Sequence, residues 1–392
     1  MGGEADITAE LQRMGAPPAD AADITAEARL RLVKIDAVPA AAAAVVRREM
    51  SACGGRAVIG GAKDQASGCL LVGTIADFRR LCERLVSAPH GLDRAAAEIG
   101  RALRDFDTPL SGALSCGSRT LPLGERTLVM GVINATADSF SGDGLGGDIA
   151  AMIARGEAMA TAGADLLDLG GESTRPGADP VDSHSEIARV VPVIEGLRRR
   201  VAAPISIDTY KPEVARAALD AGASVINDIS GLRADPEMAA LAAARGAPVV
   251  VMHMQGTPKT MQQAPDYDDL LGEIASSLRD SVELAERAGV PRHQVVIDPG
   301  FGFGKTVNHN LEIVRRLREL KSLGQPVLLG PSRKSTIGRV LDLPPQERLE
   351  GTLAVLALAV ANGVDIVRVH DVAAAVRALR MADAVVRGWA GD

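Results

Sequence analysis

Residues 205–228 read ISIDTYKPEVARAALDAGASVIND, and this stretch sets the pattern for most of the chain. A short apolar run, Ile205–Ile207, ends at the polar residue Asp208. A helical pattern then covers Pro212–Ala221, and a second apolar run begins at Val225. Short apolar runs that alternate with helices are typical of parallel strands buried on both faces.

The same unit recurs eight times between residues 121 and 392. The apolar runs are Leu128–Ile133, Leu166–Leu169, Ile205–Ile207, Val225–Ile226, Val249–Met252, Val295–Ile297, Val327–Leu329 and Ile366–Val369. Eight alternating strand–helix units predict an α/β fold of the closed (β/α)8 TIM barrel type. An open doubly wound sheet is the alternative, but it usually carries a G-x-G-x-x-G loop after its first strand, where this chain reads N-A-T-A-D from Asn134.

The composition is that of an ordinary globular protein. The chain has 392 residues, of which 47% are hydrophobic and 24% charged, with a net charge of -7. These values exclude wholesale disorder and give no basic signal for nucleic acid. Only 2% of residues are aromatic, so Ala, Val, Leu and Ile must fill the core. Such a core suits doubly buried strands and Ala-rich helices.

Neither a membrane segment nor a disulfide framework is expected. No run approaches the roughly 18 apolar residues of a membrane span, and the first residues lack a signal-peptide pattern. The apolar stretch Val38–Val46 is short and leads into Arg47, so we interpret it as a helix. The cysteines, Cys53, Cys69, Cys82 and Cys116, match no zinc or C-x-x-C spacing. We therefore expect a cytoplasmic protein with reduced thiols, bound neither to membrane nor to nucleic acid.

The barrel does not account for the whole chain. Residues 1–110 are expected to form a small N-terminal α/β domain of unknown role, because helical patterns there alternate with short strands at 56–59 and 69–74. Residues 111–120 are rich in Ser and Gly and are expected to be a linker. Residues 121–392 remain for the barrel. No catalytic cluster stands out in the N-terminal domain, which we expect to stabilise the barrel or to form oligomers.

Polar or charged residues follow every predicted strand. They include Asn134, Asp168, Asp208, Asn227, Asp228, His253, Asp298, Ser332, Arg333, Lys334, Arg368 and His370. A single loop Asp often only caps a helix. Eight strand ends of this kind indicate a site, because the active sites of such barrels lie at the carboxyl ends of the strands.

The residue types at these ends suit two kinds of ligand. A pyrophosphate would suit Arg175, Arg368 and His370, because one guanidinium group can donate to two phosphate oxygens at once. Asn134 offers a carbonyl to Mg2+, which often bridges phosphates with few protein ligands. A second set, Asp208, Asn227, Asp298 and Lys334, mixes donors and acceptors as a planar heterocycle would require.

The glycine-rich stretch Gly300–Thr306 superficially resembles a phosphate loop. The Walker pattern requires glycine at position 299, where the chain has Pro299. We therefore exclude an ATPase, and interpret the glycines as allowing the backbone to approach a flat ligand beside a Phe.

Together these motifs resemble the dihydropteroate synthase family of the folate pathway over residues 121–392. The motifs are Gly131–Asn134, Asp138–Ser141, Asp168–Gly177, Ile207–Thr209, Ile226–Asp228, Met252–Gly256, Asp298–Lys305, Ser332–Ser335 and Arg368–Asp371. The family joins 6-hydroxymethyl-7,8-dihydropterin diphosphate to 4-aminobenzoate and releases diphosphate. Any one of these motifs is weak, but the ordered set is specific.

The resemblance implies a role for each motif residue. The pterin would be held by Asp208, Asn227, Met252, Asp298, Phe303 and Lys334. The diphosphate would be held by Asn134, Arg175, Arg368 and His370, with Asn134 on the Mg2+ ion. The aminobenzoate pocket would be formed by Phe140, Thr174, Pro176, Ser335 and Lys334. The expected catalytic residues are Asp208, Lys334, Arg368 and His370. Family habit also implies a homodimer.

One motif departs from the family pattern. The first loop usually reads N-x-T-P-D-S-F-S, and Ala137 replaces its proline here, which should broaden the loop's conformational ensemble. This change leaves open a catalytically impaired pterin-binding protein. A second alternative is a pterin-binding barrel that transfers a methyl group from methyltetrahydrofolate, although such proteins do not need the cations at 333, 334 and 368.

Overall fold

The computed structural model describes residues 13–60, 66–108, 110–135, 148–173 and 178–389, together with residues 7, 10 and 11. The chain divides into two compact units, the N-terminal unit Met1–Thr108 and the barrel unit Pro109–Asp392. Among the described residues no helix combines the length and the apolar character that a membrane crossing needs.

The N-terminal unit is an α/β fold built on three antiparallel strands in the order β1-β3-β2. Its elements are α2 (Pro18–Ala28), β1 (Leu30–Pro39), α3 (Ala40–Ala52), β2 (Arg56–Ile59), β3 (Ala66–Thr74), α4 (Ile75–Val86) and α5 (Leu92–Asp107). Helix α4 begins with a capping box, in which Asp77 N–H donates to Thr74 Oγ1 and Thr74 N–H donates to Asp77 Oδ2. Strand β1 was not predicted from the sequence, because two of its leucines, Leu30 and Leu32, lie on the exposed face.

The barrel unit begins with a hairpin of β4 (Gly112–Cys116) and β5 (Arg119–Leu123). Leu114 and Leu121 pack against the first residues of the barrel strands, so the hairpin covers the barrel's amino end. Gln294 fixes it there, accepting from Ser115 N–H at 2.7 Å and donating to the carbonyl of Ala113 at 3.0 Å. Residues 112–116 and 119–123 are therefore strands of a hairpin, and the linker expected at 111–120 is wrong. The apolar residues alternate along β4, and the Ser and Gly between them concealed that period of two.

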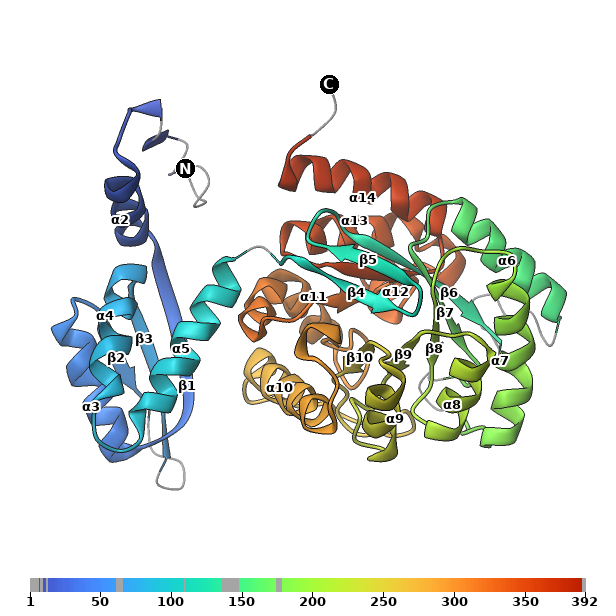
Figure 1. Ribbon diagram of the computed structural model, residues 1–392, viewed down its shortest axis with the longest axis horizontal. Helices are drawn as coiled ribbons and strands as arrows, with labels where there is room; N and C mark the ends of the chain where they lie inside the picture. The colour runs from blue at the N-terminus through green and yellow to red at the C-terminus, as the bar shows by residue number, and fades with distance from the viewer. Residues whose placement is uncertain are drawn as a thin grey trace. The chain divides into compact units, whose positions relative to one another are not determined.

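Eight parallel strands form the barrel (Figure 1). They are β6 (Leu128–Asn134), β7 (Leu166–Gly170), β8 (Ile205–Asp208), β9 (Val225–Asp228), β10 (Val249–Met252), β11 (Val295–Asp298), β12 (Leu328–Leu329) and β13 (Ile366–Val369). Their order is β11-β10-β9-β8-β7-β6-β13-β12. A parallel bridge between Ile297 and Val327 joins the two ends of this order, which closes the barrel. The predicted TIM barrel is confirmed.

Helices surround the strands (Figure 1). The α-helices are α6 (Ile149–Thr161), α7 (Ser183–Arg198), α8 (Pro212–Ala221), α9 (Glu237–Arg245), α10 (Leu270–Ala288), α11 (Val307–Arg316), α12 (Ser335–Leu341), α13 (Leu349–Ala361) and α14 (Val372–Arg387). The 3-10 helices are η1 (Arg292–Gln294), η2 (Leu317–Leu323) and η3 (Pro345–Glu347). Helix α8 shows why the elements end where they do. Pro212 suits its first turn, and Gly222, with φ of 121°, follows its last residue.

The core between strands and helices is almost free of rings, as the composition requires. Val, Ile, Leu and Ala fill it, and Phe301 is the aromatic residue among its fully buried members. Phe301 is 1% exposed, so it is a packing residue and not a candidate for ligand contact. The barrel thus carries its polar strand ends on a rigid apolar scaffold.

Candidate active site

An ion-pair network crosses the carboxyl end of the barrel. Arg368 on β13 donates from Nε to Asp168 Oδ2 at 2.6 Å and from Nη2 to Asp208 Oδ2 at 2.7 Å. Asn227 Nδ2 donates to the same Asp168 oxygen at 3.1 Å. Strands β7, β8, β9 and β13 therefore each place one polar side chain in a single cluster.

Two carboxylate oxygens in this cluster have no hydrogen-bond donor among the described residues. Asp168 Oδ1 and Asp208 Oδ1 are both buried, and neither accepts a hydrogen bond from the described residues. A buried acceptor without a donor costs about 1–3 kcal/mol. A ligand that presents N–H groups here would remove that cost, so the network is suited to a heterocycle with ring or amino donors.

Burial also changes the charge of the cluster. Desolvation raises the pKa of Asp208 to about 7, although Arg368 opposes the shift. Asp208 lies opposite Asn227 in the register of β8 and β9, as Gly170 lies opposite Asp208 in β7 and β8. A carboxyl whose pKa lies near neutrality, at a strand end, is a candidate functional group.

A second group lies at the ends of β10, β11 and β12. Asp298 accepts from Gly300 N–H at 2.7 Å, and burial raises its pKa while Lys334 opposes the shift. Lys334 donates to the carbonyl of Phe301, and its Nζ lies 4.6 Å from the ring centroid of Phe303. Burial lowers the pKa of Lys334 to about 8, although Asp298 opposes that change. Met252 is buried opposite Asp298 in the register of β10 and β11.

The anion-binding candidates lie at the ends of β6, β12 and β13. His370 and Ser332 approach each other, with His370 Nδ1 and Ser332 Oγ 3.0 Å apart. The neighbouring cation Arg333 forms an ion pair with Asp371, from Nε to Oδ2 at 2.9 Å. Asn134 ends β6, opposite Gly170 of β7. Arg368 Nη1 takes part in neither of the two carboxylate bonds described above, so it is the nitrogen of this guanidinium that we consider for a further anion.

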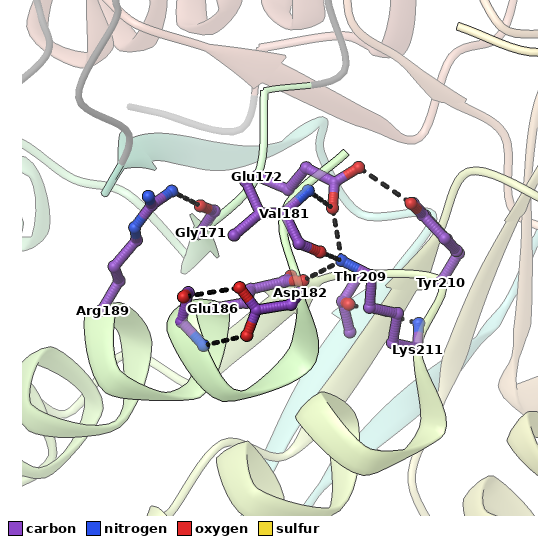
Figure 2. A network of polar contacts seen from close by, with 10 residues as sticks. Gly171, Glu172, Val181, Asp182, Glu186, Arg189, Thr209, Tyr210 and Lys211 are labelled. Atoms are coloured by element: carbon purple, nitrogen blue, oxygen red, sulfur yellow. Dashed lines mark hydrogen bonds and ion pairs between the residues drawn. The ribbon is translucent and has the colours of Figure 1, made fainter. Parts of the chain in front are cut away.

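Another polar cluster lies at the base of the loop after β7 (Figure 2). We call Glu172, Glu186, Tyr210 and Lys211 the loop-base cluster. Lys211 donates to Glu172, to the carbonyl of Val181 and, at 2.7 Å, to Glu186 Oε2. Tyr210 donates to Glu172 Oε1 at 2.9 Å. Residues before and after the segment 174–177 are thus held by one ammonium group.

Some predicted residues cannot be compared with the structure. Phe140, Thr174, Arg175 and Pro176 lie outside the described residues. Ser335 is the exposed first residue of α12, directly after Lys334.

Asp168 and Lys211 are not among the functional residues predicted from the sequence. A charged residue inside the apolar run of β7 was the signal for Asp168, which is 0% exposed. Lys211 could not have been found by pattern, because its partners come from a different strand–helix unit.

Comparisons with known proteins identify the family that the chain resembles. A family model described as pterin binding enzyme matches residues 130–370. A dihydropteroate synthase of Synechocystis is 48% identical over 73% of this chain and 98% of its own length. The solved structure of Xanthomonas albilineans dihydropteroate synthase with 4-aminobenzoic acid is 44% identical, with a TM-score of 0.64 over 70% of this chain and 98% of its own.

One relative extends beyond the barrel. A probable bifunctional folylpolyglutamate synthase/dihydropteroate synthase of Haloferax volcanii is 41% identical over 87% of this chain and 41% of its own length. That share is larger than the barrel unit alone, so part of the N-terminal unit has a counterpart in this relative.

Proposed function

Because the chain belongs to the dihydropteroate synthase family of pterin-binding enzymes, we propose that its strand-end residues divide the work of that reaction as follows. The enzyme is a transferase that joins 6-hydroxymethyl-7,8-dihydropterin diphosphate to 4-aminobenzoate, giving dihydropteroate and diphosphate. The comparisons favour this reaction over methyl transfer from methyltetrahydrofolate.

The pterin site is the part of the proposal with the most support in the structure. Asp208, Asn227 and Asp298 present acceptors and an amide at three strand ends, and Lys334 adds a cation beside the Phe303 ring. The orphan oxygens of Asp168 and Asp208 carry the assignment, because the donors that would satisfy them are absent from the described protein. Asp168 is therefore added to the pterin residues expected from the sequence. Met252 would lie beside the ring.

The diphosphate site would lie next to the pterin. Arg368, through Nη1, and His370 would neutralise the charge that develops on the leaving oxygen. Arg175 belongs to the same proposal on sequence grounds alone. The C–O bond breaks with its electron pair on diphosphate, and the methylene cation that remains is conjugated with the dihydropterin. The carboxylates of Asp208 and Asp168 would stabilise that cation.

The amine nitrogen of 4-aminobenzoate then forms the new C–N bond and releases its proton to solvent or to diphosphate. Phe140, Thr174, Pro176, Ser335 and Lys334 would form its pocket. No covalent bond to the protein is required, and none of the four cysteines lies in a barrel strand.

Mg2+ is proposed as a metal shared with the substrate. Among the described residues no group of three or more His, Cys, Asp or Glu side chains could hold a metal ion. The amide oxygen of Asn134 is a hard ligand, and Mg2+ usually combines one or two protein oxygens with water and substrate phosphates. The donor set therefore fits a metal that arrives with diphosphate, where it would absorb negative charge on the leaving group.

We also propose a homodimer. Large apolar side chains are exposed on α13 and α14, among them Leu358, Met381 and Val385. Apolar surface of this kind favours a protein partner. Sedimentation analysis of the wild type and of Met381→Glu tests this, and a monomeric wild type would contradict it. The cytoplasmic location stays a prediction from the sequence.

Turnover decides between the synthase and the impaired alternative. Purified protein mixed with the pterin diphosphate, 4-aminobenzoate and Mg2+ should form dihydropteroate, measured chromatographically. If both substrates bind and no product appears, the chain is a pterin-binding protein that has lost catalysis. Replacement of Asp208 or Lys334 by Ala should abolish turnover, and unchanged turnover in both would refute the site assignment.

A further inference from the structure

Lys305 is a buried lysine to which the proposed reaction assigns no direct role, and burial lowers its pKa to about 7. Its side chain follows the glycine-rich segment Gly300–Gly304 and is 3% exposed. Burial of a lysine without partners is costly. Its three N–H groups meet three acceptors, the carbonyl of Phe303 at 2.9 Å, Nδ1 of His253 at 3.0 Å and the carbonyl of His253 at 3.3 Å.

When Lys305 carries its proton as an ammonium, His253 Nδ1 must act as the acceptor of their contact. Burial, with the charge of Lys305, lowers the pKa of His253 to about 3, so its ring is neutral near pH 7. An Nδ1 atom that accepts from an ammonium leaves the proton on Nε2. Lys305 therefore joins the loop after β11 to the end of β10 through two backbone carbonyls and one ring nitrogen.

The segment that Lys305 holds has little structure of its own. Gly300, Gly302 and Gly304 have φ values of 71°, 85° and 60°. A Cβ atom on Gly300 would lie 1.9 Å from the carbonyl oxygen of His253, and one on Gly304 would lie 2.6 Å from that of Gln255. The segment thus lies directly against the residues after β10 and forms neither helix nor strand, so other groups must hold its backbone.

Side chains from four other places in the chain supply that support. Phe301 O accepts from Lys334, Gly302 N–H donates to Asn310 at 2.7 Å, Gly302 O accepts from Gln262 at 2.9 Å, and Gly304 O accepts from Tyr267 at 2.7 Å. Together with the bond from Lys305 to Phe303 O, these contacts fix the path of the chain on both sides of Phe303. Unlike Phe301, Phe303 is only partly buried, and its ring faces the Lys334 ammonium.

We propose that Lys305 is a positioning residue, which sets the affinity for the pterin ring by holding Phe303 in place and does not itself touch substrate. Loss of its three bonds would free the carbonyl next to the ring and detach the loop from His253. The Phe303 ring would then lose the fixed position that contact with a flat ligand requires. The inference rests on the proposed pterin site.

A double-mutant cycle tests this. The measured quantity is the Kd of 6-hydroxymethylpterin for the full chain, by calorimetry, in wild type, Lys305→Met, Phe303→Ala and the double variant. We expect Lys305→Met to raise Kd about tenfold in the wild-type background and less than about twofold in the Phe303→Ala background. Equal effects in both backgrounds would refute the proposal, because Lys305 would then act independently of Phe303.

Two controls separate positioning from loss of fold. Tyr267→Phe removes a single bond to Gly304 O and should raise Kd in the same direction by less, with little change in thermal stability. The KM for 4-aminobenzoate should stay within about twofold in the folded variants, and a rise equal to that for pterin would contradict the proposal. If wild type itself fails to bind the pterin, the proposed function is wrong. If wild type binds and the cycle is additive, only the role of Lys305 is wrong.

Discussion

Arg368 on β13 lies 2.7 Å, Nη2 to Oδ2, from Asp208 on β8, two strands that are not neighbours in the barrel. The pair therefore spans the interior of the strand-end site and does not follow a ladder of the sheet. The same guanidinium bonds Asp168 at 2.6 Å. Two carboxylates, of which Asp168 is fully buried, depend on this one cation.

Replacement of Arg368 should damage both stability and catalysis. In Arg368→Met the two carboxylates lose their partner, and removal of one member of a buried pair costs about 3–5 kcal/mol. Turnover should be lost as well, because the diphosphate loses a cation. Urea unfolding and product formation measure the two effects. Arg333→Met, which removes a partner of the single carboxylate Asp371, is the control and should cost less stability; an equal loss would contradict the role of Arg368.

Pterin affinity should be highest between about pH 7 and pH 8. The pKa of Asp208 is raised to about 7, so the ionised acceptor is present above that pH and is lost as pH falls through it. The pKa of Lys334 is lowered to about 8, so its charge is present below that pH and is lost as pH rises through it. Calorimetric Kd values for 6-hydroxymethylpterin from pH 5.5 to 9.5 measure both limbs.

Asp208→Asn separates the two limbs of this profile. The acid limb should weaken in this variant, whereas the alkaline limb should remain. An acid limb that is unchanged in Asp208→Asn would assign it to another group, such as Asp298, whose pKa burial also raises.

Much of the fold could be predicted, because a doubly buried parallel strand leaves an uninterrupted apolar run. The run Val249–Met252 coincides with β10. The apolar pattern does not set a helix boundary where a cap decides it. Helix α7 begins at Ser183, ahead of its first large apolar residue Ile187, because Asp182 accepts from Ser185 N–H at 2.9 Å. The hairpin was missed because its alternation is short and carries Ser and Gly.

The candidate site divides in the same way. Polar residues at strand ends follow from the chain alone, since the barrel brings all carboxyl ends together. The contacts that hold these polar residues in place cannot be predicted from the chain alone. Lys305 and His253 are 52 residues apart, and Lys211 and Glu172 are 39 apart. Pairs so far apart in the sequence form only when the fold brings their loops together, and no local periodicity in the sequence predicts which loops meet.

The loop-base cluster should set the affinity for 4-aminobenzoate. Lys211 holds Glu172 before, and Val181 after, the segment that carries Thr174 and Pro176 (Figure 2). In Lys211→Met these ends separate, and misplacement of a binding segment raises KM, here by about tenfold or more. Glu186, 1% exposed, would also lose its cation, which should lower the free energy of unfolding by about 3 kcal/mol.

Arg216 on α8 provides the matched control for this prediction. Its ion pair with Glu237 spans 4.0 Å with both side chains exposed, so Arg216→Met should change stability by less than about 0.5 kcal/mol. Steady-state kinetics and urea unfolding of both variants make the comparison. An aminobenzoate KM in Lys211→Met that equals the wild-type value would show that the cluster only stabilises the fold.

Truncation should show that the barrel unit begins before the hairpin. The Synechocystis relative matches over 286 residues and 98% of its length, so a barrel without an N-terminal unit is a complete synthase there. Deletion of residues 1–109 should therefore leave turnover within about twofold of wild type, as expected when a separate compact unit is removed. Deletion of 1–120 removes β4, and with it Leu114 and Cys116, which are 1% and 3% exposed against the strand starts. Because loss of even one such leucine side chain costs about 2–5 kcal/mol, this shorter protein should unfold or aggregate.

Leu114→Ala in the full chain isolates the contribution of this packing, and thermal unfolding compares the three variants. Loss of turnover on deletion of 1–109 would assign the N-terminal unit a part in catalysis, whereas a stable protein after deletion of 1–120 would show that the barrel does not need the hairpin at its amino end.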